Sequence, residues 1–378
     1  MTRVNVSAST LRWGLERARK PEVVRRKFPK LMEWLEGRSL PTLRQLQAFA
    51  KATSTPLGYL FLSEPPEEKL PIPYFRTLGD ERYRRPSADL LEIVQMMQRR
   101  QDWVREYLIE EGDEPLDFVR SVRITDEPQR VADKIRRTLG LEEGWADTQP
   151  TWSEALKSLR NSAEEVGIIV GVNSVVGNNN HRKLDVKEFR GFVLVDEYAP
   201  LIFINGADAR AAQMFTLAHE LAHVWLGSSA AFDLRELKPA DNETEQVCDR
   251  IAAEFLVPSV ELHEIWPSIS REPEPFQAIA RRFKVSELVA ARRALDLQLI
   301  RKSEFLEFYQ NYPQREPIRQ KGGDFYATQT LRLGRRFAGA VIRAVREGKL
   351  LYRGAYRLTG LYGKTFEQYA RHLWVELP

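Results

Sequence analysis

The chain has 378 residues, of which 43% are hydrophobic and 29% charged, a composition typical of a globular protein long enough for two or three domains. No apolar run approaches the ~18 residues that a membrane helix needs, and the first nine residues lack the apolar core of a signal peptide. The single cysteine, Cys248, excludes an intrachain disulfide. We therefore expect a cytoplasmic protein with no membrane partner.

The net charge of +4 conceals a strong asymmetry along the chain. Residues 1–62 hold 12 Lys and Arg against 4 Glu, and residues 321–378 hold 11 Lys and Arg against 4 Asp and Glu, so the ends carry +8 and +7 and the middle −11. Basic ends around an acidic middle indicate a polyanion partner at one end or both, and solvated basic faces are the alternative.

Residues 9–62 are predicted to form a cluster of short helices. Leu11, Leu15 and Ala18 share one face of the first helix, and Phe28, Leu31 and Leu35 mark a second that ends near residue 37. A third helix opens at residues 41–42 and a short fourth at residue 56. The stretch 64–73 contains four prolines and is predicted to be a linker.

The middle of the chain is predicted to combine helices with a small sheet. Helices are expected over 87–111, 131–139 and 153–166. Strands are expected over 168–172, 192–195 and 201–204, where the apolar runs become short. Asp208 is the expected N-cap of a helix that ends at Gly227. Further helices are expected over 243–256, from 276 to about 309, and over 333–346 beyond a loop at 321–324.

The segment Ala218-His219-Glu220-Leu221-Ala222-His223 contains the HExxH pattern inside a predicted helix. Spacing of four residues places His219 and His223 one turn apart on the same face, so both imidazoles can reach a single Zn²⁺. Glu220 lies beside them, where it can take a proton from a water molecule that the metal activates. With few histidines in the chain, a chance match is improbable, although the same ligands could hold a structural metal in a degenerate peptidase.

Catalytic zinc sites use three protein ligands and leave one position open, so a third ligand must come from elsewhere in the chain. Glu245, in an E-x-x-x-D pattern on the next predicted helix, is the expected ligand, and Asp249 would orient a zinc-bound histidine. Glu243 is a rival ligand that lacks an acidic partner four residues later. Cys248 is interpreted as a buried structural thiol that lies away from the Glu245 face. Two imidazoles and a carboxylate favour one Zn²⁺ per chain, with Mn²⁺ as the alternative.

At these residues the chain resembles the ImmA/IrrE family of metallopeptidase-like regulators. The resemblance covers Gly191-Phe192, Ile204-Asn205, residues 215–223 and residues 245–258 closely, and 150–300 loosely. It implies a gluzincin-like fold, ligands His219, His223 and Glu245, the general base Glu220, and relatives that cleave or inactivate a helix-turn-helix repressor. Residues 276–295 resemble a helical element that many relatives carry, and packing of plain helices is an equal interpretation.

Residues 9–62 resemble a divergent XRE-type helix-turn-helix domain, although the usual glycine-bearing turn before the recognition helix is absent. The resemblance implies binding to duplex DNA, and a helical dimerisation module is the alternative. The side chains expected to face phosphates or groove edges are Arg25, Arg26, Lys27, Lys30 and Arg38.

These patterns predict an α+β protein that is mostly helical. We expect a helix-turn-helix domain over 1–63, a linker and helical connector over 64–150, a gluzincin-like peptidase domain with a small sheet over 151–310, and a basic helical domain over 311–378. The favoured function is a DNA-binding regulator or antitoxin that carries a zinc metallopeptidase domain. Its expected protein partner is then a toxin, and a homodimer is one candidate assembly of the chain. The alternative is an active endopeptidase that cleaves a helix-turn-helix repressor.

Overall fold

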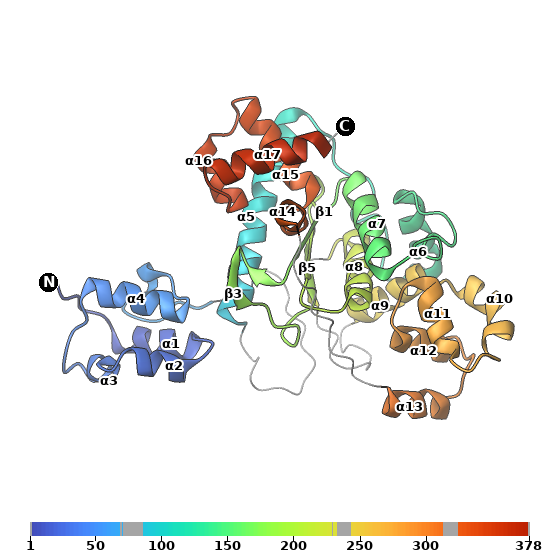
Figure 1. Cartoon of the computed structure of the whole chain (residues 1–378), viewed down its shortest axis with the longest axis horizontal. Coiled ribbons are helices and arrows are strands. Elements are labelled where there is room, and N and C mark those ends of the chain that lie inside the picture. Colours follow the sequence, from blue (N-terminus) through green and yellow to red (C-terminus); the bar gives the residue numbers. More distant parts are fainter. Residues whose placement is uncertain are drawn as a thin grey trace. The chain divides into compact units, whose positions relative to one another are not determined.

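The computed structural model describes residues 2–68, 70, 86–228, 230–232, 243–312 and 324–376 (Figure 1). These residues form a mostly helical α+β structure with a small sheet, as the sequence predicted. The chain divides into two compact units, and the division falls between Gln95 and Met96, inside helix α5 (Ala88–Glu111). Within the described ranges, no helix is both long and apolar enough to cross a membrane.

The first unit contains a cluster of short helices around its own apolar core. Its elements before α5 are α1 (Ala8–Arg17), α2 (Pro21–Lys27), α3 (Leu31–Leu35), α4 (Leu43–Thr53) and the 3-10 helix η1 (Leu57–Phe61). Leu11, Leu46 and Phe49 are buried at its centre, and the rings of Phe28 and Phe49 meet edge to face at 5.7 Å. Thr42 and Gln45 form a reciprocal capping box that begins α4.

The predicted second helix, marked by Phe28, Leu31 and Leu35, corresponds to α3, and α2 before it was not predicted. Pro21 begins α2 at the first helical position, where a missing N–H is harmless. Phe28 leaves the helical region with φ −122° and ψ 79°, because it precedes Pro29 and the proline ring disfavours α-helical backbone before it. The chain then turns into α3, so the basic end of α2 and the start of α3 are separated by a break.

The second unit is built on a four-stranded sheet in the order β1-β5-β4-β6. The strands are β1 (Ile169–Asn173), β5 (Leu201–Asn205), β4 (Gly191–Leu194) and β6 (Ala230–Phe232). β1 and β5 are parallel, whereas β4 is antiparallel to both β5 and β6. The predictions of β1, β4 and β5 are confirmed, each shifted by about one residue. The hairpin of β2 (Val175–Val176) and β3 (Asn179–Lys183) was not predicted, because β3 is polar throughout.

Two helices at the centre of this unit carry the HExxH and E-x-x-x-D patterns. Helix α8 (Arg210–Leu226) packs on β4, β5 and α9 (Glu243–Leu256), and is buried from Gln213 to Trp225. Gly227 ends α8 in the left-handed region with φ 79°, as predicted. Asp208 is not the N-cap: that residue is Ala209, and the Asp208 carboxylate accepts the adjacent N–H of Ala209 and forms an ion pair with Arg190.

The remaining helices surround this centre (Figure 1). They are α6 (Pro128–Thr138), α7 (Trp152–Glu165), α10 (Ser259–Ile269), α11 (Pro275–Phe283), α12 (Glu287–Asp296), α13 (Lys302–Asn311), α14 (Phe325–Leu333), α15 (Arg335–Arg346), α16 (Tyr352–Thr359) and α17 (Lys364–Glu376). The predicted helix over 333–346 corresponds to α15, which begins after Gly334; the φ of 81° at Gly334 separates it from α14, which was not predicted.

The C-terminal helices cover one edge of the sheet. Helix α14 packs against β1, and a Cβ added at Gly171 of β1 would lie 3.4 Å from the Arg332 carbonyl oxygen. A covered edge strand cannot pair with another chain. Part of the predicted linker, residues 69 and 71–73, and residues 321–323 of the predicted loop lie outside the described residues.

Candidate metal centre

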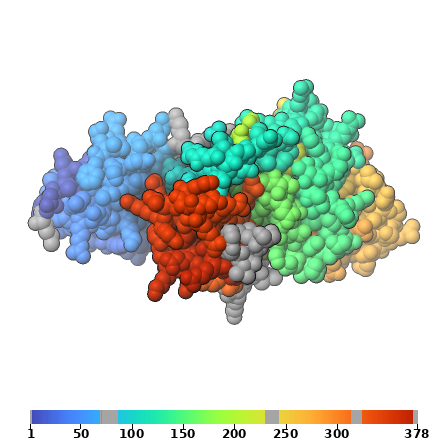
Figure 2. All heavy atoms as spheres, turned by 90° about the horizontal axis from the view of Figure 1, so that it is seen from above, coloured from blue at the N-terminus to red at the C-terminus, as the bar shows by residue number. Residues whose placement is uncertain are grey.

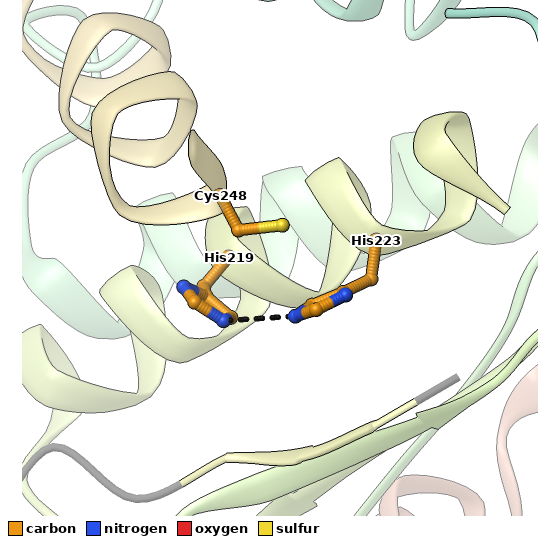
Figure 3. A group of neighbouring side chains, drawn as sticks. All are labelled: His219, His223 and Cys248. Carbon is orange, nitrogen blue, oxygen red and sulfur yellow. Dashed lines mark hydrogen bonds between the residues drawn. The ribbon is translucent and has the colours of Figure 1, made fainter. Parts of the chain in front are cut away.

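The structure brings His219 and His223 of α8 together with Glu245 of α9, and all three side chains are buried. The histidines lie one turn apart, and Figure 3 shows their rings projecting from α8 toward each other. The two Nε2 atoms are 3.1 Å apart. Glu245 approaches both rings, with one carboxylate oxygen 3.1 Å from His219 Nε2 and the other 3.2 Å from His223 Nε2.

Asp249 holds the other side of His219. Its Oδ1 lies 3.0 Å from Nδ1 of His219, as expected if the ring donates this hydrogen bond and turns Nε2 toward Glu245 and His223. Asp249 is one turn after Glu245 on α9, so one helix supplies both carboxylates. The rival candidate Glu243 is exposed at the start of α9, and the structure does not bring it to the site.

Burial and the carboxylates act on the histidines in opposite directions. Burial lowers the pKa of His219, but hydrogen bonds to Asp249 and Glu245 outweigh it and raise that pKa above its usual range. Burial lowers the pKa of His223. Burial also raises the pKa of Glu245, but its hydrogen bonds to both histidines prevail and hold it below the usual range. The pocket therefore stabilises one positive charge beside Glu245.

Glu220 is fully buried next to this group, and neither of its carboxylate oxygens has a hydrogen-bond partner among the described residues. Burial raises its pKa well above the usual value; His219 acts to lower it, and Glu245 to raise it further. A buried carboxylate without partners is expensive, by about 1–3 kcal/mol or more. Such a group calls for an explanation other than stability.

Gly191 is a site residue that sequence reasoning did not assign. A Cβ added there would lie 2.5 Å from Thr216 Cγ2, 2.9 Å from the Phe203 carbonyl oxygen and 3.1 Å from Glu220 Oε1. Only glycine lets β4 approach the face of α8 that carries Glu220 so closely. The available signal was a glycine at the start of an apolar strand that precedes the HExxH helix.

Cys248 corrects one interpretation of the sequence. It is buried, as expected, but it does not lie away from the site: its sulfur and nitrogen atoms of His219 and His223 all lie within 4.8 Å of one another (Figure 3). Three residues along a helix correspond to about 300°, so Cys248 lies only about 60° from Glu245 around α9. Glu245 places one carboxylate oxygen 3.1 Å from His219 Nε2 and the other 3.2 Å from His223 Nε2, within hydrogen-bonding distance of both rings.

The donor set fits a zinc ion. Two nitrogens bound to one tetrahedral zinc at about 2.0–2.1 Å stand roughly 3.3 Å apart, and the two Nε2 atoms are 3.1 Å apart. A carboxylate oxygen completes three ligands without moving either helix, and the site favours a positive charge at this point. These residues therefore could hold one divalent cation with a nitrogen and oxygen preference.

The predicted DNA-binding residues lie in the first unit. Arg25, Arg26 and Lys27 form the last turn of α2, and Lys30 immediately precedes α3; all four are exposed. Arg38 is also exposed, but it forms an ion pair with Glu36. The structure therefore groups four of the five cations around the break between α2 and α3.

Comparisons with known protein families match two separate segments of the chain. Residues 163–295, which include α8, α9 and Gly191, match the family model of the IrrE N-terminal-like domain, Peptidase_M78. Residues 333–372 match a domain of unknown function, DUF8813. A comparison with curated proteins found no match. The segment that carries the candidate metal centre is thus similar to a metallopeptidase-type domain of the ImmA/IrrE kind.

Proposed function

We propose that residues 163–295 form a zinc-dependent peptidase domain that hydrolyses a peptide bond of a protein substrate. The observation that supports this most directly is Glu220, a buried carboxylate that has no hydrogen-bond partner among the described residues and lies beside His219, His223 and Glu245. A site that served only to hold a structural metal would not need such a group.

The roles of the side chains follow from their positions. His219, His223 and Glu245 would hold the zinc, which supplies a Lewis acid that polarises the substrate carbonyl and activates water. Glu220 would accept a proton from the attacking water at one of its free carboxylate oxygens and deliver it to the leaving amine. Asp249 fixes the orientation of the His219 ring. The tight contact at Gly191 keeps Glu220 beside the metal ligands.

Metal analysis of the purified full chain tests the ligand assignment. We expect one zinc per chain in the wild type, loss of stoichiometric zinc in His223→Ala, and retention in Glu220→Gln. His263→Ala, which replaces an exposed histidine of α10, is the matched control and should retain its zinc. Undiminished zinc in folded His223→Ala would overturn the assignment.

We also propose that the first unit binds duplex DNA, so that the chain acts as a transcriptional regulator or antitoxin. The supporting observation is the group of exposed cations at the break between α2 and α3. Arginine and lysine side chains bind phosphate oxygens and position a protein on the duplex.

Fluorescence anisotropy on duplex DNA from the promoter of the gene tests this proposal. Replacing Arg25, Arg26 and Lys27 with Ala should weaken binding by on the order of 10²-fold and flatten its salt dependence, since about three counterion-releasing contacts are lost. The control replaces Arg12, Arg44 and Lys51, which are equally exposed cations of the same unit. Equal losses in both triple variants would show that only net charge matters, and no binding by the wild type at low salt would support the dimerisation alternative.

The protein partner would be a repressor cleaved at the metal centre or a toxin neutralised by binding. Glu220→Gln separates the two in a co-expression assay with the product of a neighbouring gene. Neutralisation of a toxin that survives this substitution proceeds by binding, and neutralisation that is lost with fold, zinc and DNA binding intact is catalytic. Size measurement of the full chain would decide whether it acts as a homodimer.

A further inference from the structure

The surface of helix α16 and the turn that follows it combines exposed rings with cations. Between Glu347 and Glu367 the chain has no acidic residue and four basic ones, namely Lys349, Arg353, Arg357 and Lys364. Lys349 is paired with Glu111 and Glu347. The other three are exposed and form no ion pair with any described residue.

Large apolar side chains lie exposed on the same surface. Leu351 is 78% exposed, Tyr352 53% and Tyr362 67%. Tyr352 and Tyr356 stand 6.0 Å apart between ring centroids, and Tyr356 and Tyr362 5.8 Å apart, so the rings form one continuous group. We call Leu351, Tyr352, Arg353, Tyr356, Arg357, Tyr362 and Lys364 the α16 surface. Exposed aromatic groups of this size mark interaction sites more often than isolated surface residues do.

The sequence of α16 explains how rings and charges alternate. The pattern Tyr352-Arg353-Gly354-Ala355-Tyr356-Arg357 repeats after four residues, which places the tyrosines in one row and the arginines in the adjacent row. Ala355 and the ring of Phe366 are buried below and hold the helix in place. Helix α16 lies at the margin of the C-terminal helices (Figure 1), and these helices form a prominent block in the space-filling view (Figure 2).

We infer that the α16 surface binds a single-stranded nucleic acid, with bases stacked on Tyr352 and Tyr362 and phosphates paired with Arg353, Arg357 and Lys364. Rows of aromatic rings beside unpaired cations are the means by which proteins bind single strands without reading sequence. Four helical residues rise by about 6 Å, which is comparable to the separation of successive phosphates in an extended strand.

Two other occupants fit these observations less well. A duplex keeps its bases stacked on one another, so exposed rings on a short helix would find no free base face. A protein partner is the stronger alternative, because aromatic side chains and arginine are enriched at protein interfaces, but it would have to supply acidic groups for three cations and separate contacts for the rings. A single strand offers both base faces and phosphates at once.

The test uses the full chain with Arg25, Arg26 and Lys27 replaced by Ala, so that binding by the first unit is weakened and contributes little to the measurement. Anisotropy is measured with labelled dT20, with U20 and with a 20-base-pair duplex. We expect dT20 or U20 to bind in a salt-dependent manner and more tightly than the duplex. Comparing dT20 with U20 shows whether the site distinguishes DNA from RNA.

Four double variants in this background separate stacking from charge. Replacing Tyr352 and Tyr362 with Ala should weaken single-strand binding by on the order of 10–100-fold, since two base-stacking contacts are lost, whereas Phe at both positions should preserve it. Replacing Arg353 and Arg357 with Ala should weaken binding and reduce its salt dependence. The charge-matched control replaces exposed Arg271 and Lys302, and should bind within twofold of the background chain.

Unchanged binding of dT20 and U20 in the folded Tyr352→Ala, Tyr362→Ala variant would overturn the inference. So would a preference for the duplex, or no single-strand binding at low salt, and either result would assign the surface to a protein partner instead. Photo-crosslinking of iodouracil-substituted single strands to the full chain gives an independent readout, because the inference requires crosslinks at Tyr352 or Tyr362.

Discussion

Two buried carboxylates of the second unit, Glu164 and Glu220, are accommodated by their surroundings in opposite ways. Glu164, near the end of α7, accepts hydrogen bonds from the backbone of Arg335 and Arg336 at the start of α15 and from Val170. Glu220, in the middle of α8, has no such partner among the described residues. Both carboxylates are removed from water, but only Glu164 gains hydrogen bonds from described residues that offset the cost of losing its hydration.

This difference separates a structural carboxylate from a functional one. Helix α15 has no side-chain cap from its own N-cap residue, Gly334, so Glu164 occupies the position of the missing cap. It thereby joins the segment similar to an IrrE N-terminal-like domain to the segment that matches DUF8813. Glu220 joins nothing. Glu220 interacts electrostatically with His219 and Glu245, and reactivity explains its position better than stability does.

The largest expected effect is on catalysis in Glu220→Gln. The amide has nearly the same shape but cannot accept a proton near neutral pH, so hydrolysis of the partner protein should fall by about 10²–10⁴-fold. Stability should stay equal or rise, because the amide cannot take on a charge at this buried position. Glu164→Gln is the matched variant and should keep its hydrolytic rate. Gel-based cleavage assays and thermal unfolding of both variants compare the two carboxylates. Cleavage by Glu220→Gln at the wild-type rate would show that Glu220 is not the base.

A smaller effect is expected on metal affinity when the support of His219 is removed. Asp249→Ala takes away the oxygen that orients the ring, and the zinc affinity should fall by about 10–100-fold. Asp249→Asn keeps an accepting oxygen, so its zinc affinity should fall less than that of Asp249→Ala. Competition with a chromophoric chelator measures both affinities. Equal affinity in all three proteins would show that the ring is held by its burial alone.

Sequence reasoning succeeded where the relevant geometry is local to one helix. The spacing of His219 and His223 and that of Glu245 and Asp249 are each one helical turn, and the structure brings all four side chains together. The misplacement of Cys248 was an error in the same local geometry, because a separation of three residues also stays near one helix face. The strands β1, β4 and β5 were predictable because they are buried throughout and, except for the terminal Asn173 and Asn205, contain only apolar residues and glycine.

The remaining features depend on contacts that no local pattern encodes. Gly191 matters because β4 meets α8 there, and its neighbour Thr216 is 25 positions away in the chain. Glu164 meets Arg336 across 172 positions. Strand β6 has three residues and is defined by its pairing with β4, not by a periodic pattern of its own. Such features follow from tertiary packing, so the sequence alone could not place them.

The smallest effect concerns the pH dependence of stability and tests Glu164 directly. Burial raises the pKa of Glu164 from 4.5 to about 7, although Arg160 and the backbone hydrogen bonds act to lower it. The folded protein thus holds this proton more tightly than the unfolded chain does. The stabilisation is fully present below pH 4.5 and is lost as the pH rises through about 7.

Glu164→Gln abolishes this titration, so its stability relative to the wild type should change with pH in one direction. At pH 5 the variant should be less stable, because the amide presents an N–H group to backbone donors at the start of α15. Between pH 5 and 8 the free energy of unfolding of Glu164→Gln should rise relative to that of the wild type by about 1–3 kcal/mol, because the wild type alone must ionise a buried group. Glu165→Gln replaces the exposed neighbour and should show no such trend. In chemical denaturation, parallel pH profiles of the unfolding free energy for the wild type and Glu164→Gln would mean that Glu164 ionises as freely in the folded protein as in water. Its contrast with Glu220 would then rest on hydrogen bonding alone.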